Sequence, residues 1–198
     1  MLPTDTRQRV EEAGAFTENI KRDSLKAELE NIGYTESNVS TTTVRSLDLI
    51  DCSKSDLLGK IISQMNDFFP NCKLRQIFYV IDGSAPTAAN QKFHFDTIPS
   101  IKFIFNISGS GKGGTEFAVG SHKGWRQKVN KLVVKRGFYG HHKYGFQNVN
   151  VDKYSKIDTK NSNIAIFDTD IVHRALVDPS VTIESPRKTL IAAWTKPI

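Results

Sequence analysis

Apolar residues recur along the chain with two different periods, and the change from one to the other comes near residue 74. Before this point the spacing is helical, and it predicts one helix over 24–32 and a second over 57–69. The second helix follows Ser53 and Asp56, which are spaced as in a capping box. Its single stripe of leucine, isoleucine, methionine and phenylalanine is typical of a helix that packs against a core.

After residue 74 the apolar positions alternate, which is typical of β-strands. The segments between the two helical patterns carry weaker signals. Residues 1–22 are polar and are expected to fray, and residues 34–46 are expected to form a loop or an edge strand. Turn residues separate the predicted strands, which are 74–81, 91–96, 101–107, 115–119, 163–167 and 188–195.

This order of elements predicts a single domain over 1–198, with an N-terminal helical cap over 1–73 and a β core over 74–198. Many short strands after an initial helical part indicate a mainly β fold with flanking N-terminal helices, as in a jelly roll. There is no apolar run of about 18 residues and no signal-peptide pattern, so no membrane partner and a cytoplasmic location are expected. Cys52 and Cys72 lack metal-site spacing and are expected to be free thiols.

Charge changes this picture in one place. The chain carries a formal net charge of +6, but residues 121–160 contain ten lysines and arginines against two aspartates. The segment therefore has a net charge of +8, and the remaining residues sum to −2. Aromatic residues are interleaved with the cations. A basic, aromatic insert favours an anionic small-molecule substrate, with nucleic acid as a less favoured partner, although a solvated surface insertion has the same composition.

The candidate chemistry begins at His94 and Asp96, in the sequence Phe-His-Phe-Asp. Alternate residues of a strand share one face, so the imidazole and the carboxylate are expected to lie side by side. The intervening phenylalanine then points into an apolar layer. A second histidine would complete a 2-His-1-carboxylate triad, which binds Fe(II) and leaves coordination positions open. This spacing alone is a weak signal, because a surface histidine and aspartate also produce it.

The residues that follow strengthen the signal. His173 stands on a predicted strand entered by an acidic turn and is the best third ligand, although a lone histidine there is often a satisfied buried residue. Asp168 and Asp170 either orient His173 or simply form the turn. Arg187 and Thr189 share one face of the last strand, where a guanidinium fork beside a hydroxyl suits a buried dicarboxylate. A salt bridge at the rim is the alternative for the arginine.

Taken together, these motifs resemble the Fe(II)/2-oxoglutarate-dependent dioxygenases. The resemblance rests on His94-x-Asp96, Gly-Gly-Thr-Glu-Phe at 113–117, Gly-Ser-His at 120–122, His173 and Arg187-x-Thr189. Some of these motifs look like the phytanoyl-CoA dioxygenase family, and others look more like prolyl-hydroxylase-type members. The resemblance covers roughly residues 74–198 and implies a double-stranded β-helix, the cupin-like jelly roll.

The resemblance also implies a cofactor set and a role for each site residue. Fe(II) would be held by His94, Asp96 and His173, and the co-substrates would be 2-oxoglutarate and O2. Arg187, assisted by Thr189, would pair with the distal carboxylate of 2-oxoglutarate. Gln76, on the predicted strand 74–81, is loosely similar to a residue that contacts 2-oxoglutarate in some relatives. Lys102 is expected to face solvent. The implied reaction hydroxylates a C–H bond of the substrate.

The basic insert is expected to connect strands near the open mouth of the barrel and to act as a lid. The lid residues would be Lys128, Lys131, Lys135 and Arg136, while His122, His141 and His142 are expected on the surface or in the lid. Two other functions remain open at this point. One is a metal-binding, cupin-like isomerase or lyase that needs no 2-oxoglutarate, and the other is a non-catalytic jelly roll that binds nucleic acid.

Overall fold

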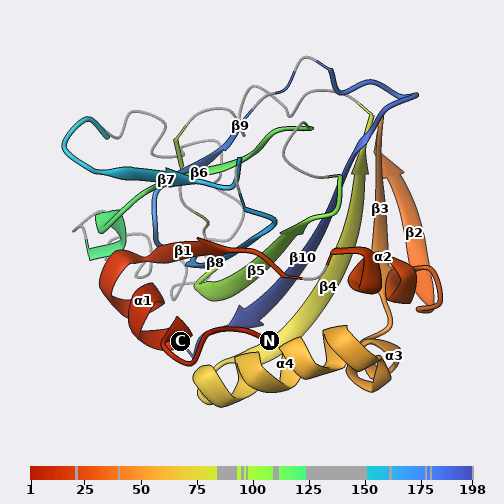
Figure 1. Ribbon diagram of the computed structural model, residues 1–198, viewed down its shortest axis with the longest axis horizontal. Coiled ribbons are helices and arrows are strands. Elements are labelled where there is room, and N and C mark those ends of the chain that lie inside the picture. The colour runs from red at the N-terminus through yellow and green to blue at the C-terminus, as the bar shows by residue number, and fades with distance from the viewer. Residues whose placement is uncertain are drawn as a thin grey trace.

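A computed structural model of the chain describes residues 1–20, 22–39, 41–83, 93–94, 96, 98–108, 112–123, 151–160, 162–176, 178 and 180–197. Within them, two antiparallel sheets face each other, and helices cover the outer side of the larger sheet (Figure 1). The larger sheet has the strand order β1-β8-β5-β10-β4-β3-β2, and the smaller has the order β7-β6-β9. This is the predicted fold class: mainly β with N-terminal helices, arranged as a cupin-like double-stranded β-helix.

The strands of the larger sheet are β1 (Ala15–Glu18), β2 (Tyr34–Val39), β3 (Thr42–Leu47), β4 (Lys73–Asp82), β5 (Ser100–Asn106), β8 (Ile164–Asp168) and β10 (Arg187–Thr195). The smaller sheet is made of β6 (Gly114–Ala118), β7 (Lys156–Asp158) and β9 (His173–Leu176). The helices are α1 (Thr6–Ala13), α2 (Arg22–Leu29), α3 (Leu49–Lys54), α4 (Asp56–Phe68) and the 3-10 turn η2 (Ser121–Lys123).

Helix α4 supports the larger sheet from outside, as its apolar stripe predicts. Its buried residues Leu58, Ile61 and Met65 belong to the same core cluster as residues of β5 and β10. A hydrogen bond adds to this packing, because the Trp194 indole N–H donates to Asn66 Oδ1 at 2.8 Å. A buried indole needs such a partner. The helix therefore fixes β10 from behind, and β10 lies at the centre of the sheet.

Strand β5 is buried on the face toward the helices and partly buried on the other. Phe103 and Phe105 pack in the core under the helices, whereas Ile104 points to the other side, into the space between the two sheets. Lys102 and Asn106 share the face of Ile104 by the alternation of a strand. The inner face of the barrel therefore carries polar side chains. The register of β10 against β5 and β4 determines which of these side chains lie opposite one another.

The N-terminal segment differs from its prediction. The expected fraying of 1–22 is wrong for the elements described there, since α1 packs through Val10 and β1 pairs with β8 at the edge of the larger sheet. Gly14 makes this possible: it ends the helix with a φ of 86°, and a Cβ there would lie 2.5 Å from His122 Nδ1. Few apolar residues mark this region, and Phe16 becomes buried only through pairing with a distant strand.

The segment before α4 contains the edge strand that was one of its two predictions. Strand β2 lies at the edge of the larger sheet and pairs with β3, and β3 pairs with β4. Asp48 caps α3, because its carboxylate accepts hydrogen bonds from two backbone N–H groups of the first turn. The N-cap of α4 is Ser55 rather than Ser53. Cys52 and Cys72 are free thiols, as predicted. Among the described helices, none is long and apolar enough to cross a membrane.

Replacing Phe103 tests the packing between β5 and the helices. Phe103→Ala removes a fully buried ring and leaves a cavity, so the free energy of unfolding should fall by about 3–5 kcal/mol. Urea denaturation measures this change. Ile183→Ala is the control, because Ile183 is 69% exposed and its loss should change stability by less than about 0.5 kcal/mol. Equal effects of the two substitutions would contradict this account of the core.

Candidate metal centre

Two backbone hydrogen bonds join the histidines of the predicted triad. His94 N–H donates to the His173 carbonyl at 2.9 Å, and His173 N–H donates to the His94 carbonyl at 2.7 Å. The residues form an antiparallel bridge, and their ring centroids lie 4.5 Å apart. Directly paired residues of antiparallel strands project to the same face. The bridge therefore places both imidazoles on the inner face, where Phe167 packs 5.1 Å from the His173 ring.

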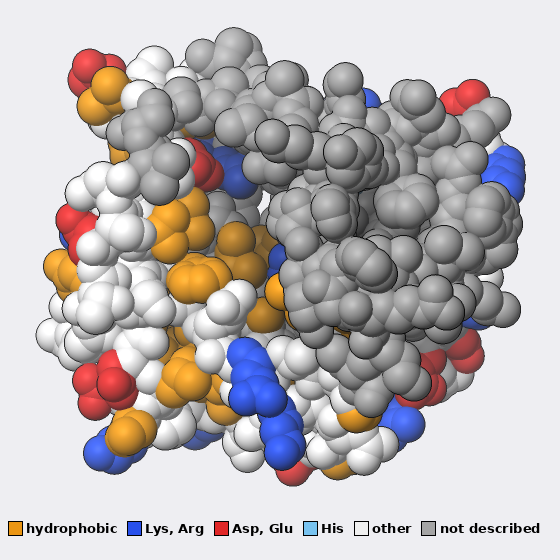
Figure 2. All heavy atoms as spheres, turned by 180° about the vertical axis from the view of Figure 1, so that it is seen from behind, with side chains coloured by type: hydrophobic (Ala, Val, Ile, Leu, Met, Phe, Trp, Pro, Cys, Tyr) orange, Lys and Arg blue, Asp and Glu red, His pale blue; other side chains and the backbone are white. Residues whose placement is uncertain are grey.

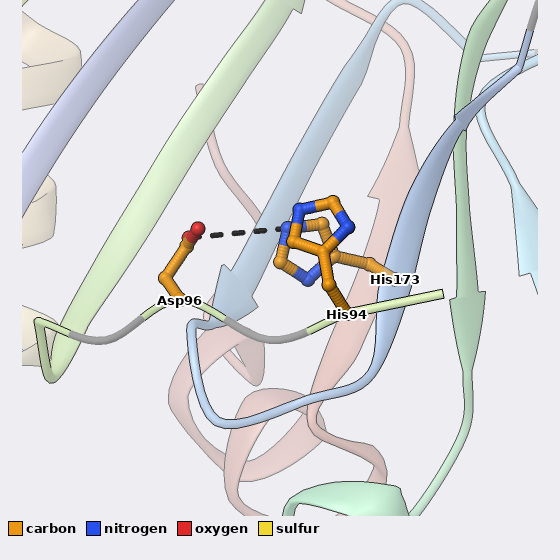
Figure 3. Close-up of side chains that lie close together, drawn as sticks. All are labelled: His94, Asp96 and His173. Carbon is orange, nitrogen blue, oxygen red and sulfur yellow. Dashed lines mark ion pairs between the residues drawn. The ribbon is translucent and has the colours of Figure 1, made fainter. Parts of the chain in front are cut away.

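Asp96 completes the group two residues later. Its backbone N–H donates to the Thr169 carbonyl at 3.1 Å, which ties this segment to the turn before β9. Its Oδ2 lies 3.9 Å from Nε2 of His173, and one ligand atom from each of the three residues lies within 4.8 Å of the others. Figure 3 shows the three side chains converging from two segments far apart in sequence. The structure thus brings together His94, Asp96 and His173.

The protonation of His173 follows from its second ring nitrogen. Nδ1 lies 2.9 Å from the Ile171 carbonyl oxygen, which can only accept, so Nδ1 carries the proton. Nε2 then presents its lone pair toward Asp96. Burial lowers the pKa of His173 to about 4, despite the opposing effect of the Asp96 carboxylate. A neutral imidazole lone pair and a carboxylate that face each other form a donor set for a cation.

Lys102 also belongs to this group. Its Nζ lies 2.8 Å from Asp96 Oδ2, and both side chains are 25% exposed. Burial raises the pKa of Asp96, but the positive charge of Lys102 and the effect of His173 outweigh it, and the net pKa is about 2. The prediction that Lys102 faces solvent is wrong, because the inner face of β5 lies inside the barrel. Ile104 on the same face was the available signal, since it indicates a strand buried on both sides.

Asp168 and Asp170 form a hydrogen-bonded turn before His173. Ile171 N–H donates to the Asp168 carbonyl, and Asp170 N–H donates to the Asp168 side chain, both at 2.9 Å. The ion-pair partner that the structure describes for both aspartates is Lys196, which lies 3.6 Å from Asp170 and forms a short contact with Asp168. The hydrogen-bond partner that the structure describes for His173 Nδ1 is the Ile171 carbonyl, so this carbonyl orients the ring.

Arg187 and Thr189 lie on the inner face of β10, as their spacing predicts. Arg187 is opposite Asp82 on β4, its Nε lies 3.5 Å from Asp82 Oδ2, and its side chain is 15% exposed. Burial lowers the pKa of Arg187, and Asp82 opposes this change. Within the described part of the chain, Nε makes no hydrogen bond. Thr189 is buried opposite Asn106 of β5.

Gln76 lies far along β4 from the end of the sheet that holds Arg187. It is opposite Ala193, and Ala193 is opposite Lys102 on the other side, so these three residues form one row across the inner face. Arg187 is six residues from Ala193 along β10, so their Cα atoms lie about 20 Å apart before the length of the side chains is counted. Gln76 is therefore a neighbour of the Lys102 end, whereas Arg187 stands at the opposite end of the same strand.

The hypothesis of a basic lid falls on residues that the structure does not describe. These are Lys128, Lys131, Lys135 and Arg136, and His141 and His142 also lie outside the described residues. The beginning of the segment is described: His122 Nε2 lies 3.1 Å from the Glu11 carbonyl oxygen, beside α1 rather than in the triad. Phe93, which alternates with His94 along the chain, is half-buried against the apolar cluster of Ala118, Val151 and Val172.

Solved structures of other proteins resemble this fold, whereas comparisons of sequence find no match. No family model matches the chain, and no curated protein matches it in sequence. Among solved structures, HygX from Streptomyces hygroscopicus with nickel and 2-oxoglutarate bound is similar with a TM-score of 0.55. The identity is 10%, over 100% of this chain and 89% of HygX.

Two further structures show the same likeness. EvdO2 from Micromonospora carbonacea var. aurantiaca, complexed with 2-oxoglutarate, has a TM-score of 0.57 at 10% identity, covering 100% of this chain and 93% of EvdO2. SnoN, a non-heme α-ketoglutarate-dependent epimerase from nogalamycin biosynthesis, has a TM-score of 0.57 at 12% identity, covering 96% and 82%. At such low identity these likenesses establish a shared fold, and the chemistry has to be argued from the residues of this chain.

The lowered pKa of His173 predicts how stability depends on pH in the metal-free protein. An unfolded histidine has a pKa of about 6.5 and the folded one about 4, so the unfolded state binds more protons between these values. The stabilisation is complete above about pH 6.5 and is lost as the pH falls toward about 4. Between pH 7 and pH 5 the free energy of unfolding should fall by about 2 kcal/mol.

Urea denaturation with a chelator present measures this loss. His173→Gln should reduce it, because glutamine has no proton to gain, whereas His122→Gln should retain it. A loss of the same size in His173→Gln would show that other groups cause the pH dependence.

Proposed function

We propose that this chain is an Fe(II)- and 2-oxoglutarate-dependent oxygenase whose iron is held by His94, Asp96 and His173. The observation that carries the proposal is the convergence of two imidazoles and one carboxylate inside the barrel, within 4.8 Å of one another. Nitrogen and oxygen donors in this combination suit Fe(II) and leave coordination positions for other ligands. The structural likeness to enzymes whose names state 2-oxoglutarate dependence supports the same choice.

The donor set fits a metal cation because it holds two electron-rich atoms close together. Nε2 of His173 and Oδ2 of Asp96 are both electron-rich, and the scaffold holds them 3.9 Å apart. The Ile171 carbonyl fixes the tautomer that leaves Nε2 free to coordinate, as the second hydrogen bond of metal-ligating histidines commonly does. Bound iron would supply the oxidising chemistry together with 2-oxoglutarate and O2. The protein's own part is to orient these ligands and to keep the surroundings apolar, with Phe117 and Phe167 beside His173.

Arg187 is proposed to bind the distal carboxylate of 2-oxoglutarate, with Thr189 assisting. A guanidinium presents five N–H donors, and a buried one needs acceptors. Asp82 lies 3.5 Å from Nε, yet that N–H forms no hydrogen bond to a described residue, which leaves donor capacity for an incoming carboxylate. Thr189 is buried on the same face and offers a hydroxyl. Gln76, at the Lys102 end, is proposed as a contact nearer the metal.

The substrate is proposed to be a small anionic molecule whose C–H bond is hydroxylated. The net charge of +8 in residues 121–160 supports an anion, because a basic segment raises the local concentration of negative ligands. The face behind the view of Figure 1 has hydrophobic side chains gathered around a hollow (Figure 2). Half-buried Phe78, Val80 and Ile191 of the larger sheet would offer an apolar wall to such a substrate.

The first test of this function is the release of succinate from 2-oxoglutarate. Wild-type protein with Fe(II) and O2 should release succinate even without a substrate, and Asp96→Ala should reduce it by at least about 100-fold, because a carboxylate ligand is lost. Asp56→Ala is the control, since Asp56 is exposed on α4 and pairs only with Lys60 among the described residues. Iron-dependent turnover without succinate would favour a cupin-like isomerase or lyase instead.

The second test concerns Arg187. Arg187→Lys keeps the charge but loses the fork of parallel donors, so the KM for 2-oxoglutarate should rise by about tenfold or more. Metal affinity should change much less, because Arg187 is not a ligand in this proposal. Arg45→Lys is the matched control, as Arg45 pairs with Glu36 at the outer edge of the larger sheet. An unchanged KM would assign the carboxylate to another cation.

A further inference from the structure

A partly buried lysine beside the carboxylate ligand is the most unusual feature of the proposed metal centre. Lys102 projects from β5 into the barrel and places its Nζ 2.8 Å from Asp96 Oδ2. The same oxygen lies 3.9 Å from His173 Nε2. A divalent ion bound by Asp96 would therefore share this carboxylate with an ammonium group. The pairing of β5 with β10 and β8 on its two sides fixes the backbone of Lys102 at this position beside the ion.

The charges at the centre determine how Lys102 affects binding of a metal. Of the described side chains at the centre, Asp96 contributes −1, Lys102 contributes +1, and coordinated histidines are neutral. Binding of a divalent ion then brings the group to +2, whereas a triad without the lysine would reach only +1. A charge of +2 in a partly buried site is unfavourable unless an anion joins it. A dianion such as 2-oxoglutarate restores neutrality.

The inner surface beside Lys102 suits such an anion. Ala193 lies directly opposite Lys102 on β10, and Gln76 lies beyond it on β4 in the same row. Both Lys102 and Gln76 have N–H donors, and a carboxylate accepts from such groups. The partly buried Lys102 and the exposed Gln76 therefore offer N–H donors to an anion on this face.

We infer that Lys102 couples the two binding steps of the proposed centre: it weakens the binding of a divalent metal alone and strengthens the binding of metal and dianionic co-substrate together. This inference rests on the proposed function, because it takes His94, Asp96 and His173 as the ligands. It assigns Lys102 a positioning and regulatory role that the triad itself does not need. In the metal-free protein the same lysine compensates the charge of Asp96.

The experiment measures Mn(II) binding by calorimetry with and without saturating 2-oxoglutarate, in the absence of O2. In Lys102→Met the affinity for Mn(II) alone should rise by about tenfold or more, because the neighbouring positive charge is gone. The factor by which 2-oxoglutarate strengthens Mn(II) binding should shrink by about tenfold or more. Lys102→Gln keeps an N–H donor but no charge and should behave in the same way, which provides a second variant if methionine disturbs folding.

Lys60→Met is the matched control, because it removes the same charge from an exposed pair with Asp56 and should leave both quantities unchanged. Weaker Mn(II) binding in both Lys102 variants would overturn the inference and identify the lysine as a support for Asp96. Equal coupling in wild type and variants would overturn it as well. Absence of Mn(II) binding in every protein would instead refute the proposed metal centre, so the two failures are distinguishable.

Discussion

The two hydrogen bonds between the backbones of His94 and His173 are the constraint on which the site depends. They join segments 79 positions apart and set which side chains face the inside of the barrel. A shift of one residue in this pairing would turn one imidazole toward the outer layer, where Phe93 packs now. Asp96 depends on the same pairing, since its backbone is held by Thr169 in the turn that leads into β9.

The larger sheet supplies the rigid support for this bridge. Helix α4 packs on its outer side and covers β5 and β10 from behind, and the pairing of these strands holds their inner residues in fixed rows. A cation on the inner face is only partly exposed to water, and burial of an unpaired charge is costly. Lys102 therefore pairs with Asp96, and Arg187 lies against Asp82. The charges inside the barrel are thus a consequence of strand alternation combined with burial on both faces.

Much of this arrangement could be read from the sequence because it depends on local periodicity. The stripe of α4 and the alternation of β4, β5 and β10 are short-range patterns, and they predicted these elements to within a residue or two. The spacing of His94 and Asp96 predicted one shared face, and the turn at 168–170 placed His173 at the start of a strand. The convergence of the three residues needed the resemblance to known enzymes as well, since spacing alone cannot show which strands meet.

What the sequence did not reveal comes from long-range pairing. Strand β1 is stable because it pairs with β8, about 150 residues later, and a short polar segment gives no sign of that partner. Lys102 looked like a solvent-facing residue because its strand neighbours are apolar, and its contact with Asp96 depends on how the chain turns between them. The role of the Ile171 carbonyl, in place of the nearby aspartates, follows from backbone geometry that residue types do not encode.

The most direct test of the account is an anomalous difference map from a crystal of the Mn(II)-loaded protein. The account predicts one strong peak inside the barrel, at about 2 Å from one nitrogen of His94, one nitrogen of His173 and a carboxylate oxygen of Asp96, as metal–ligand bonds of this kind require. A map in which the ion lies elsewhere, or in which no peak appears and Lys102 alone occupies the space beside Asp96, would contradict it.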